Sequence, residues 1–164
     1  MTPMPLPLLF LLAAQITPVK PLPKANPLPL ADIDTRAVMA PIDAMFAGLA
    51  ARDGAAILAQ VRTEGGATVV REAPDGTRTI KHLSWADFAG GIKPGPEHYE
   101  ERLTDPAIEV DGDIAMVWSP YVFTVDGRAH HCGVDHFDLV REGDGWKVLN
   151  VTWSQRTTGC EVAK

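Results

Sequence analysis

Three glycine-containing turns divide the second half of the chain into long segments that are rich in strand-forming residues. The turns Asp111-Gly112, Asp126-Gly127 and Gly143-Asp144-Gly145 separate the segments 99–110, 113–125, 128–141 and 146–156. An Asp-Gly pair between such segments favours a tight β-hairpin, because glycine readily adopts the left-handed conformation that the turn requires. The sequence therefore predicts three consecutive hairpins, which form a four-stranded antiparallel meander.

The region before these strands is predicted to contain helices. Apolar residues follow the 3.6-residue period of an amphipathic helix at Val38, Ile42, Met45, Phe46 and Leu49. A short helix is expected over 55–61, and Ser84 is placed to cap a third helix with an apolar stripe of Trp85, Phe88 and Ile92. Short extended segments are expected at 68–71 and 79–83. Helices that precede a meander indicate an α+β fold.

The first thirty residues differ in composition from the rest of the chain. The apolar run that ends at residue 14 is shorter than the about 20 residues of a membrane-spanning helix, but it has the length of a signal-peptide core. Residues 15–30 are rich in proline, which favours an extended, disordered linker. We therefore expect a signal peptide over 1–14, a folded domain over 31–164, and an exported protein, periplasmic or secreted, without a membrane span in its mature form.

The composition is that of a globular domain without affinity for nucleic acid. Hydrophobic residues make up 46% of the chain and charged residues 22%, which is enough apolar material for a buried core. The net charge is −6, and no cluster of Lys and Arg occurs. Binding to the phosphate backbone of DNA or RNA is therefore not expected.

The order of elements resembles the nuclear transport factor 2-like (NTF2-like) superfamily, in particular its small SnoaL-like and lumazine-binding-type bacterial proteins. The resemblance covers about residues 33–160 and is carried by the segments 42–53, 112–118 and 131–148. It implies a cone-like α+β fold in which N-terminal helices pack on a curved antiparallel sheet around a pocket. Members of the superfamily include isomerases, dehydratases, cyclases and ligand carriers, so the resemblance implies no single activity, and we expect no cofactor.

The segment 130–141 concentrates polar residues that could serve a site. Alternation along a strand places His131, Asp135, Phe137 and Leu139 on one face, which the two large apolar residues assign to the core. Asp135 and His131 are then expected to line the pocket, although roughly 13 Å of strand separates them. A carboxylate in an apolar cavity has a raised pKa and can transfer protons, so Asp135 is the candidate catalytic base. A purely structural aspartate is the alternative.

Trp118, Tyr121 and His82 are further candidates for pocket residues. A tight turn at 126–127 sets Trp118 opposite Asp135 on the core face, whereas a tight turn at 111–112 places Trp118 on the other face. A β-bulge resolves this conflict, and we expect one near Ser119-Pro120. Both aromatic residues remain candidates for the pocket, and His82 is a possible additional polar group.

The opposite face of the same strand offers a weaker alternative, a zinc site. His130 and Cys132 lie about 6.5 Å apart along the strand, but a third ligand has to come from His136 or Cys160. No Cys-x-x-Cys or His-x-x-x-His pattern supports such a site, so no metal is expected. The hairpin register places Cys132 opposite about Gln155, five residues short of Cys160. A disulfide requires the tail to double back near Gly159, so we expect free thiols.

Apolar residues on both faces of the last strands suggest a homodimer through the outer sheet face. In a regular strand, Leu149, Val151 and Trp153 cannot all turn inward together with Trp146 and Val148. Three functional hypotheses remain open. The chain binds a small, partly apolar molecule, or it is an isomerase, dehydratase or cyclase with Asp135 as general base, or it is a dimeric interaction module whose pocket is filled.

Overall fold

The computed structural model describes residues 35–161. The predicted signal peptide, the whole predicted linker and both ends of the predicted domain 31–164 lie outside these residues. Within them, three helices and seven strands follow one another as α1 (Thr35–Ala50), α2 (Gly54–Leu58), β1 (Val61–Glu72), β2 (Arg78–Ser84), α3 (Trp85–Gly91), β3 (Tyr99–Leu103), β4 (Ala107–Asp111), β5 (Ile114–Val125), β6 (Arg128–Glu142) and β7 (Gly145–Gln155).

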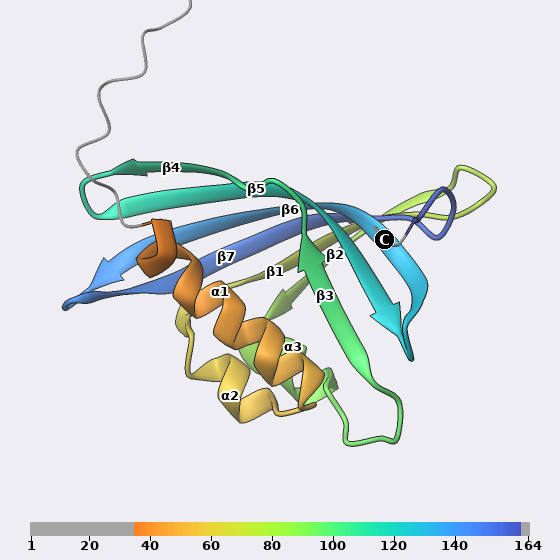
Figure 1. Ribbon diagram of the computed structural model, residues 1–164, viewed down its shortest axis with the longest axis horizontal. Helices are drawn as coiled ribbons and strands as arrows, with labels where there is room; N and C mark the ends of the chain where they lie inside the picture. The colour runs from red at the N-terminus through yellow and green to blue at the C-terminus, as the bar shows by residue number, and fades with distance from the viewer. Residues whose placement is uncertain (1–34, 162–164) are drawn as a thin grey trace, which may run out of the picture. The chain divides into compact units, whose positions relative to one another are not determined.

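The strands form a single sheet that the three helices cover on one face (Figure 1). The strand order is β2-β1-β7-β6-β5-β3. The strand β4 also pairs with β5, along residues 114–118, whereas β3 pairs along residues 121–125. The hairpins β4-β5, β5-β6 and β6-β7 are antiparallel, as the three turns predict. The α+β arrangement is therefore confirmed.

Two features of the sheet differ from the prediction. The expected strand 99–110 is split into β3 and β4, because Asp105 adopts a positive φ of 47° and Pro106 has no N–H to donate to a ladder. The sheet is also mixed and not wholly antiparallel, because β1 runs parallel to β7. No turn motif connects these two strands, so their pairing leaves no local signal in the sequence.

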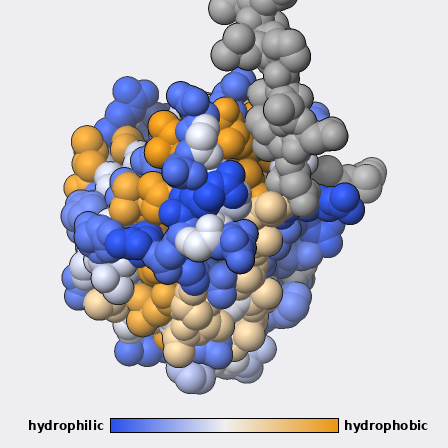
Figure 2. All heavy atoms as spheres, turned by 90° about the vertical axis from the view of Figure 1, so that its left-hand side faces the viewer, coloured by the Kyte–Doolittle hydropathy of each residue, from blue (hydrophilic) through white to orange (hydrophobic). Residues whose placement is uncertain are grey.

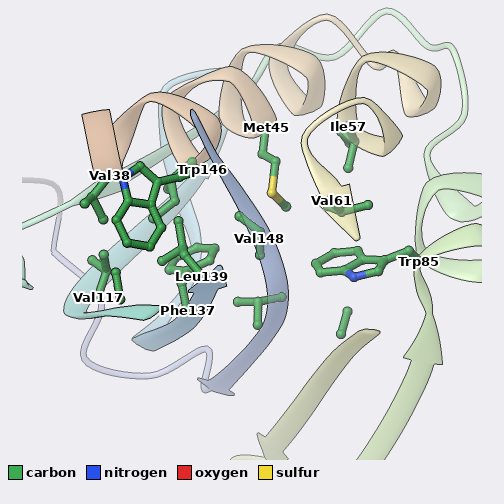
Figure 3. Packing of buried hydrophobic residues seen from close by; sticks show 14 residues of the cluster. Val38, Met45, Ile57, Val61, Trp85, Val117, Phe137, Leu139, Trp146 and Val148 are labelled. Carbon is green, nitrogen blue, oxygen red and sulfur yellow. The ribbon is translucent and has the colours of Figure 1, made fainter. Parts of the chain in front are cut away.

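The helices α2 and α3 begin after capping side chains, Asp53 and Ser84, and the helices bury apolar residues against the sheet. Ser84 accepts a hydrogen bond of 3.1 Å from the backbone N–H of Asp87, which confirms the predicted cap of α3. Figure 3 shows the buried cluster between the layers, with Trp85 near Ile57 and Val61. The indole N–H of Trp85 donates to the carbonyl of Leu149 at 2.9 Å, which ties α3 to β7.

A β-bulge in β6 determines which side chains face the helices. Phe123 pairs with His131 and Thr124 pairs with Ala129, so His130 is the extra residue. The bulge shifts the register by one residue, and Ser119, not Trp118, lies opposite Asp135. The expected bulge near Ser119-Pro120 is therefore misplaced, although the conflict that it was meant to resolve is real.

A second bulge, at Leu149 in β7, removes the basis for the predicted apolar outer face of that strand. Leu139 pairs with Val148 and Asp138 pairs with Asn150, so the alternation of side chains restarts after Leu149. Trp153 consequently turns toward the helices and packs edge-to-face on Phe88, with 6.2 Å between ring centroids. Trp153 cannot be the outer-face residue that the dimer argument used.

Cys132 and Cys160 form a disulfide, so the expectation of free thiols is wrong. Their α-carbons lie 5.5 Å apart. The bulge at Leu149 moves the partner of Cys132 to Arg156, and these two residues exchange two backbone hydrogen bonds of 3.0 Å. Gly159, with a φ of 67°, then turns the tail back toward β6. Because both sulfur atoms are bonded to each other, neither is available for the zinc site that we considered.

Candidate functional site

A cavity of about 340 Å³ lies between the helices and the sheet. The helices α1, α2 and α3 contribute only apolar side chains to its wall, among them Phe46, Ile57 and Phe88. The polar side chains come from the strands and the residues next to them, and they are Arg71, Tyr99, Glu101, Tyr121, His130, His131, Asp135 and Gln155. The cavity is therefore apolar on its helical side and carries polar groups on its sheet side.

Asp135 faces this cavity, as the alternation along β6 predicts. Its side chain is 2% exposed, and its Oδ2 atom has no hydrogen-bond partner among the described residues. Burial raises the pKa of the Asp135 carboxyl well above its ordinary value, and the charge of nearby Glu101 raises it further. Asp135 therefore carries a proton at pH values where an exposed aspartate is ionised.

Glu101, on β3, completes a carboxyl pair with Asp135. Burial raises the pKa of Glu101 to about 7, and a hydrogen bond from Asp135 acts in the opposite direction. The same hydrogen bond raises the pKa of Asp135. This pattern is that of an acid that donates to a neighbouring carboxylate, so Asp135 keeps the shared proton and Glu101 is the first of the two to ionise.

Tyr121 lies beside the pair, on the inner face of β5. It pairs with Gly133 of β6, and its hydroxyl donates to the carbonyl of Ser154 on β7 at 3.1 Å. A Cβ atom at Gly133 would lie 1.9 Å from that carbonyl oxygen, so only glycine fits beneath the tyrosine. Burial and the two carboxyl groups raise the pKa of Tyr121, which keeps its phenol protonated.

His131 forms part of the same wall and is uncharged at neutral pH. It stacks on Phe123 with 4.7 Å between ring centroids, and its Nδ1 lies 2.8 Å from Nδ1 of His130. Burial lowers the pKa of His131 to about 4, and the charges of His130 and Arg71 contribute to the decrease. The bulge at His130 allows two consecutive histidines to reach one cavity, although strict alternation assigns them to opposite faces.

Two of the expected pocket residues lie elsewhere. Trp118 is 50% exposed on the outer face of the sheet, where its ring lies 5.7 Å from that of His136. His82 is exposed on the edge strand β2, and its Nδ1 lies 2.9 Å from the hydroxyl of Thr68. The structure thus corrects both assignments, and of the two aromatic candidates only Tyr121 lines the cavity.

Five polar cavity residues were not predicted from the sequence, namely Arg71, Tyr99, Glu101, His130 and Gln155. Glu101 and Arg71 carry the carboxyl and the guanidinium group among them. Glu101 lies two residues from both Tyr99 and Leu103 on β3, and Arg71 lies two residues from Val69 on β1. Each position therefore shares a face with residues that point inward. This alternation was the available signal, but Glu101 and Arg71 also resemble ordinary polar residues of short or edge strands.

Comparison with solved structures identifies the fold. An NTF2-like protein with a cystatin-like fold from Novosphingobium aromaticivorans superposes with a TM-score of 0.60 and 16% identity, over 77% of this chain and 84% of that chain. The chain has the NTF2-like fold. An NTF2-like protein from Cytophaga hutchinsonii superposes with a TM-score of 0.57 and 9% identity, over 75% of this chain and 98% of that one. A cystatin-like-fold protein of unknown function from Nostoc punctiforme gives a TM-score of 0.58 and 11% identity, over 80% and 97%.

These similarities concern the fold of the chain and not its activity. No protein-family profile matches the sequence, and no curated protein matches it either. Within residues 35–161, no three His, Cys, Asp or Glu side chains converge on a point where a metal ion could bind. No helix in this part of the chain is both long enough and apolar enough to cross a membrane. The chemistry of the cavity is therefore the main guide to function.

Proposed function

We propose that this NTF2-like protein binds a small, partly apolar molecule in the cavity beneath its helices. The observation that carries the proposal is the unpartnered Oδ2 atom of Asp135 inside a largely apolar wall. Buried polar atoms almost always have hydrogen-bond partners, and an unpartnered one costs about 1–3 kcal/mol. A ligand with one polar group and an apolar body supplies the missing partner and fills a cavity of this size.

The proposed site of action lies outside the cytoplasm, in the periplasm or beyond it. Two features support export. The N-terminal apolar run followed by small residues has the composition of a signal peptide. The disulfide between Cys132 and Cys160 is of a kind that persists in oxidising compartments and is rare in the cytoplasm of mesophiles.

An acid–base enzyme is the second candidate, because a specific observation favours it. Glu101 and Asp135 share a proton, and Glu101 ionises at about pH 7. A pair of this kind can accept and return a proton during an isomerisation, dehydration or cyclisation. For such an enzyme, Asp135→Asn abolishes turnover while substrate still binds. The third hypothesis, an interaction module with a filled pocket, is disfavoured by the cavity itself.

A neutral fluorescent probe tests the binding proposal. N-phenyl-1-naphthylamine is expected to increase in fluorescence on binding the wild-type protein. Leu49→Trp places a larger ring in the cavity wall and should reduce binding at least about tenfold, because the added ring occupies ligand volume. Ile80→Trp is the matched control, since Ile80 is 75% exposed on β2. Equal binding by all three proteins, or no binding to wild type, contradicts the proposal.

We further propose that the protein forms a homodimer through the outer face of β5 and β6. Trp118 and Ile114, 50% and 59% exposed, lie on the outer side of β5 beside partly buried Val134 and Val140 of β6. On the side of the molecule that Figure 2 shows, hydrophobic side chains form patches that hydrophilic ones interrupt. The exposed apolar side chains of β5, with their neighbours on β6, are the surface that we propose for the dimer.

Sedimentation velocity tests the dimer. Wild type should sediment at twice the mass of the chain at micromolar concentration, and Trp118→Glu should dissociate it, because a buried unpaired charge costs several kcal/mol. Ile80→Glu introduces the same charge on the edge strand β2 and should leave the mass unchanged. A monomeric wild-type protein would remove the proposed interface.

A further inference from the structure

The carboxyl pair is the feature of the cavity that restricts the ligand most strongly. Neither Glu101 nor Asp135 forms an ion pair with any residue of the described range 35–161. The unpartnered oxygen of Asp135 is almost completely buried and belongs to a side chain that lines the cavity. The two carboxyl groups therefore present acceptor oxygens to the cavity without an ion-pair partner among the described residues, although Arg71 also lines the cavity wall.

From this arrangement we infer that the cavity selects small organic cations, with an ammonium group bound between Glu101 and Asp135 and an apolar body against the helices. The inference rests on the proposed function and specifies the chemical class of its ligand. A protonated amine can donate hydrogen bonds to both carboxyl groups. It also neutralises the negative charge of Glu101, which has no ion-pair partner among the described residues.

The other titratable and charged groups of the cavity do not replace such a ligand. The charge of Arg71, on β1, lowers the pKa of Tyr121 and of His131. The charge of Arg156, which follows β7, lowers the pKa of Tyr121. Neither arginine contributes to the shifted pKa of Glu101 or of Asp135, which burial and mutual proximity determine. The two histidines of the cavity belong to β6, Tyr99 to β3 and Tyr121 to β5. The helices contribute no charged group to the cavity.

Aromatic rings in the wall favour the same ligand class. Phe137 lies two residues from Asp135 on the same face of β6. Trp153, on β7, is the strand partner of Asp135 on β6, and both aromatic residues line the cavity. The face of an aromatic ring attracts a cation within about 6 Å of its centroid. An anionic ligand, in contrast, meets the charge of Glu101, and a neutral ligand leaves that charge uncompensated.

The inference predicts a direction for the pH dependence of binding. Since the pKa of Glu101 lies at about 7 in the unliganded protein, the pair gains negative charge as the pH rises through that value. Amine affinity should therefore increase from about pH 5.5 to about pH 8, where a primary alkylamine is still protonated. The affinity of a neutral analogue should change little over the same interval.

Three matched naphthalene compounds test the inference by isothermal titration calorimetry. At about pH 8, 2-naphthylmethylamine should bind at least about tenfold more tightly than 2-naphthalenemethanol, because hydrogen bonds between charged groups are about twice as strong as neutral ones. 2-Naphthoate should bind more weakly than both. Glu101→Gln, or wild type at about pH 5.5, should lose the preference for the amine.

Glu100→Gln is the matched control. It removes one negative charge from the neighbouring residue, whose carboxylate pairs with Arg102 at the surface, so the preference for the amine should persist. If the alcohol binds as tightly as the amine, the inference is overturned while the proposed function stands. If neither compound nor the neutral fluorescent probe binds, the proposed function fails together with the inference. Circular dichroism of Glu101→Gln verifies that the variant is folded, and the pH comparison on wild type does not depend on it.

Discussion

Glu101→Gln is expected to gain about 2–3 kcal/mol of folding stability relative to wild type when the pH is raised from about 5 to about 8. The pKa of Glu101 is about 7 in the folded protein and near 4.5 in an exposed glutamate. The folded state therefore holds a proton that the unfolded state releases. The resulting stability is fully present below about pH 4.5 and is lost as the pH rises through 7. Glutamine does not ionise, so the variant avoids this loss.

Urea unfolding followed by tryptophan fluorescence measures the difference at each pH. The variants have to be compared at the same pH, because His131 also makes the stability depend on pH. Its contribution is lost as the pH falls, whereas that of Glu101 is lost as the pH rises. The pKa of His131 is about 4 in the folded protein against 6.5 in an exposed histidine, so its contribution is lost as the pH falls below about 6.5. Glu100→Gln, which removes the same charge from the neighbouring residue, serves as the control. A free-energy difference that is the same at both pH values would show that Glu101 titrates normally.

Reduction of the disulfide is expected to lower the free energy of unfolding by about 3–4 kcal/mol. The bridge closes a loop with a sequence separation of 28, and a loop of this length restricts the unfolded chain by about that amount. Urea unfolding with and without a reductant measures the effect. The double variant Cys132→Ala/Cys160→Ala should be insensitive to the reductant. Two thiols that react with an alkylating agent in the denatured, unreduced protein would contradict the bridge.

The elements that local signals specify could be predicted from the sequence. Asp-Gly turns identify the hairpins, and Ser84 identifies the start of α3. The bulges at His130 and Leu149 could not be predicted in place, because packing across the sheet determines where the extra residue fits. Each bulge shifts the pairing of its two strands by one residue, so the side chains beyond it lie on the face opposite to the one expected from an unbulged hairpin. This effect explains why Trp118 lies outside, why Trp153 lies inside, and why Cys160 can reach its partner.

The site was predictable only where local alternation determines it, and not where it depends on contacts between distant strands. Asp135 could be assigned to the cavity because alternation along β6 is regular from Asp135 to Leu139. Glu101 could not be assigned as its partner, because the two carboxyl groups meet only when β3 and β6 flank β5. That contact depends on the break at Asp105-Pro106, which separates β3 from β4. The pairing of β1 with β7, which positions Arg71 on the cavity wall, is likewise a long-range contact.

Carboxyl-carbon NMR of selectively labelled protein tests most directly whether the cavity holds a buried proton-sharing pair. The side-chain carboxyl resonances of Glu101 and Asp135 are followed from about pH 3 to about pH 9. Glu101 is expected to titrate near pH 7 and Asp135 well above the pH of an exposed aspartate, because burial raises the pKa of both groups and the hydrogen bond leaves the proton on Asp135. Midpoints below about pH 5 for both residues would mean that water solvates the pair, and the cavity would then lose the buried charge on which the proposed ligand chemistry depends.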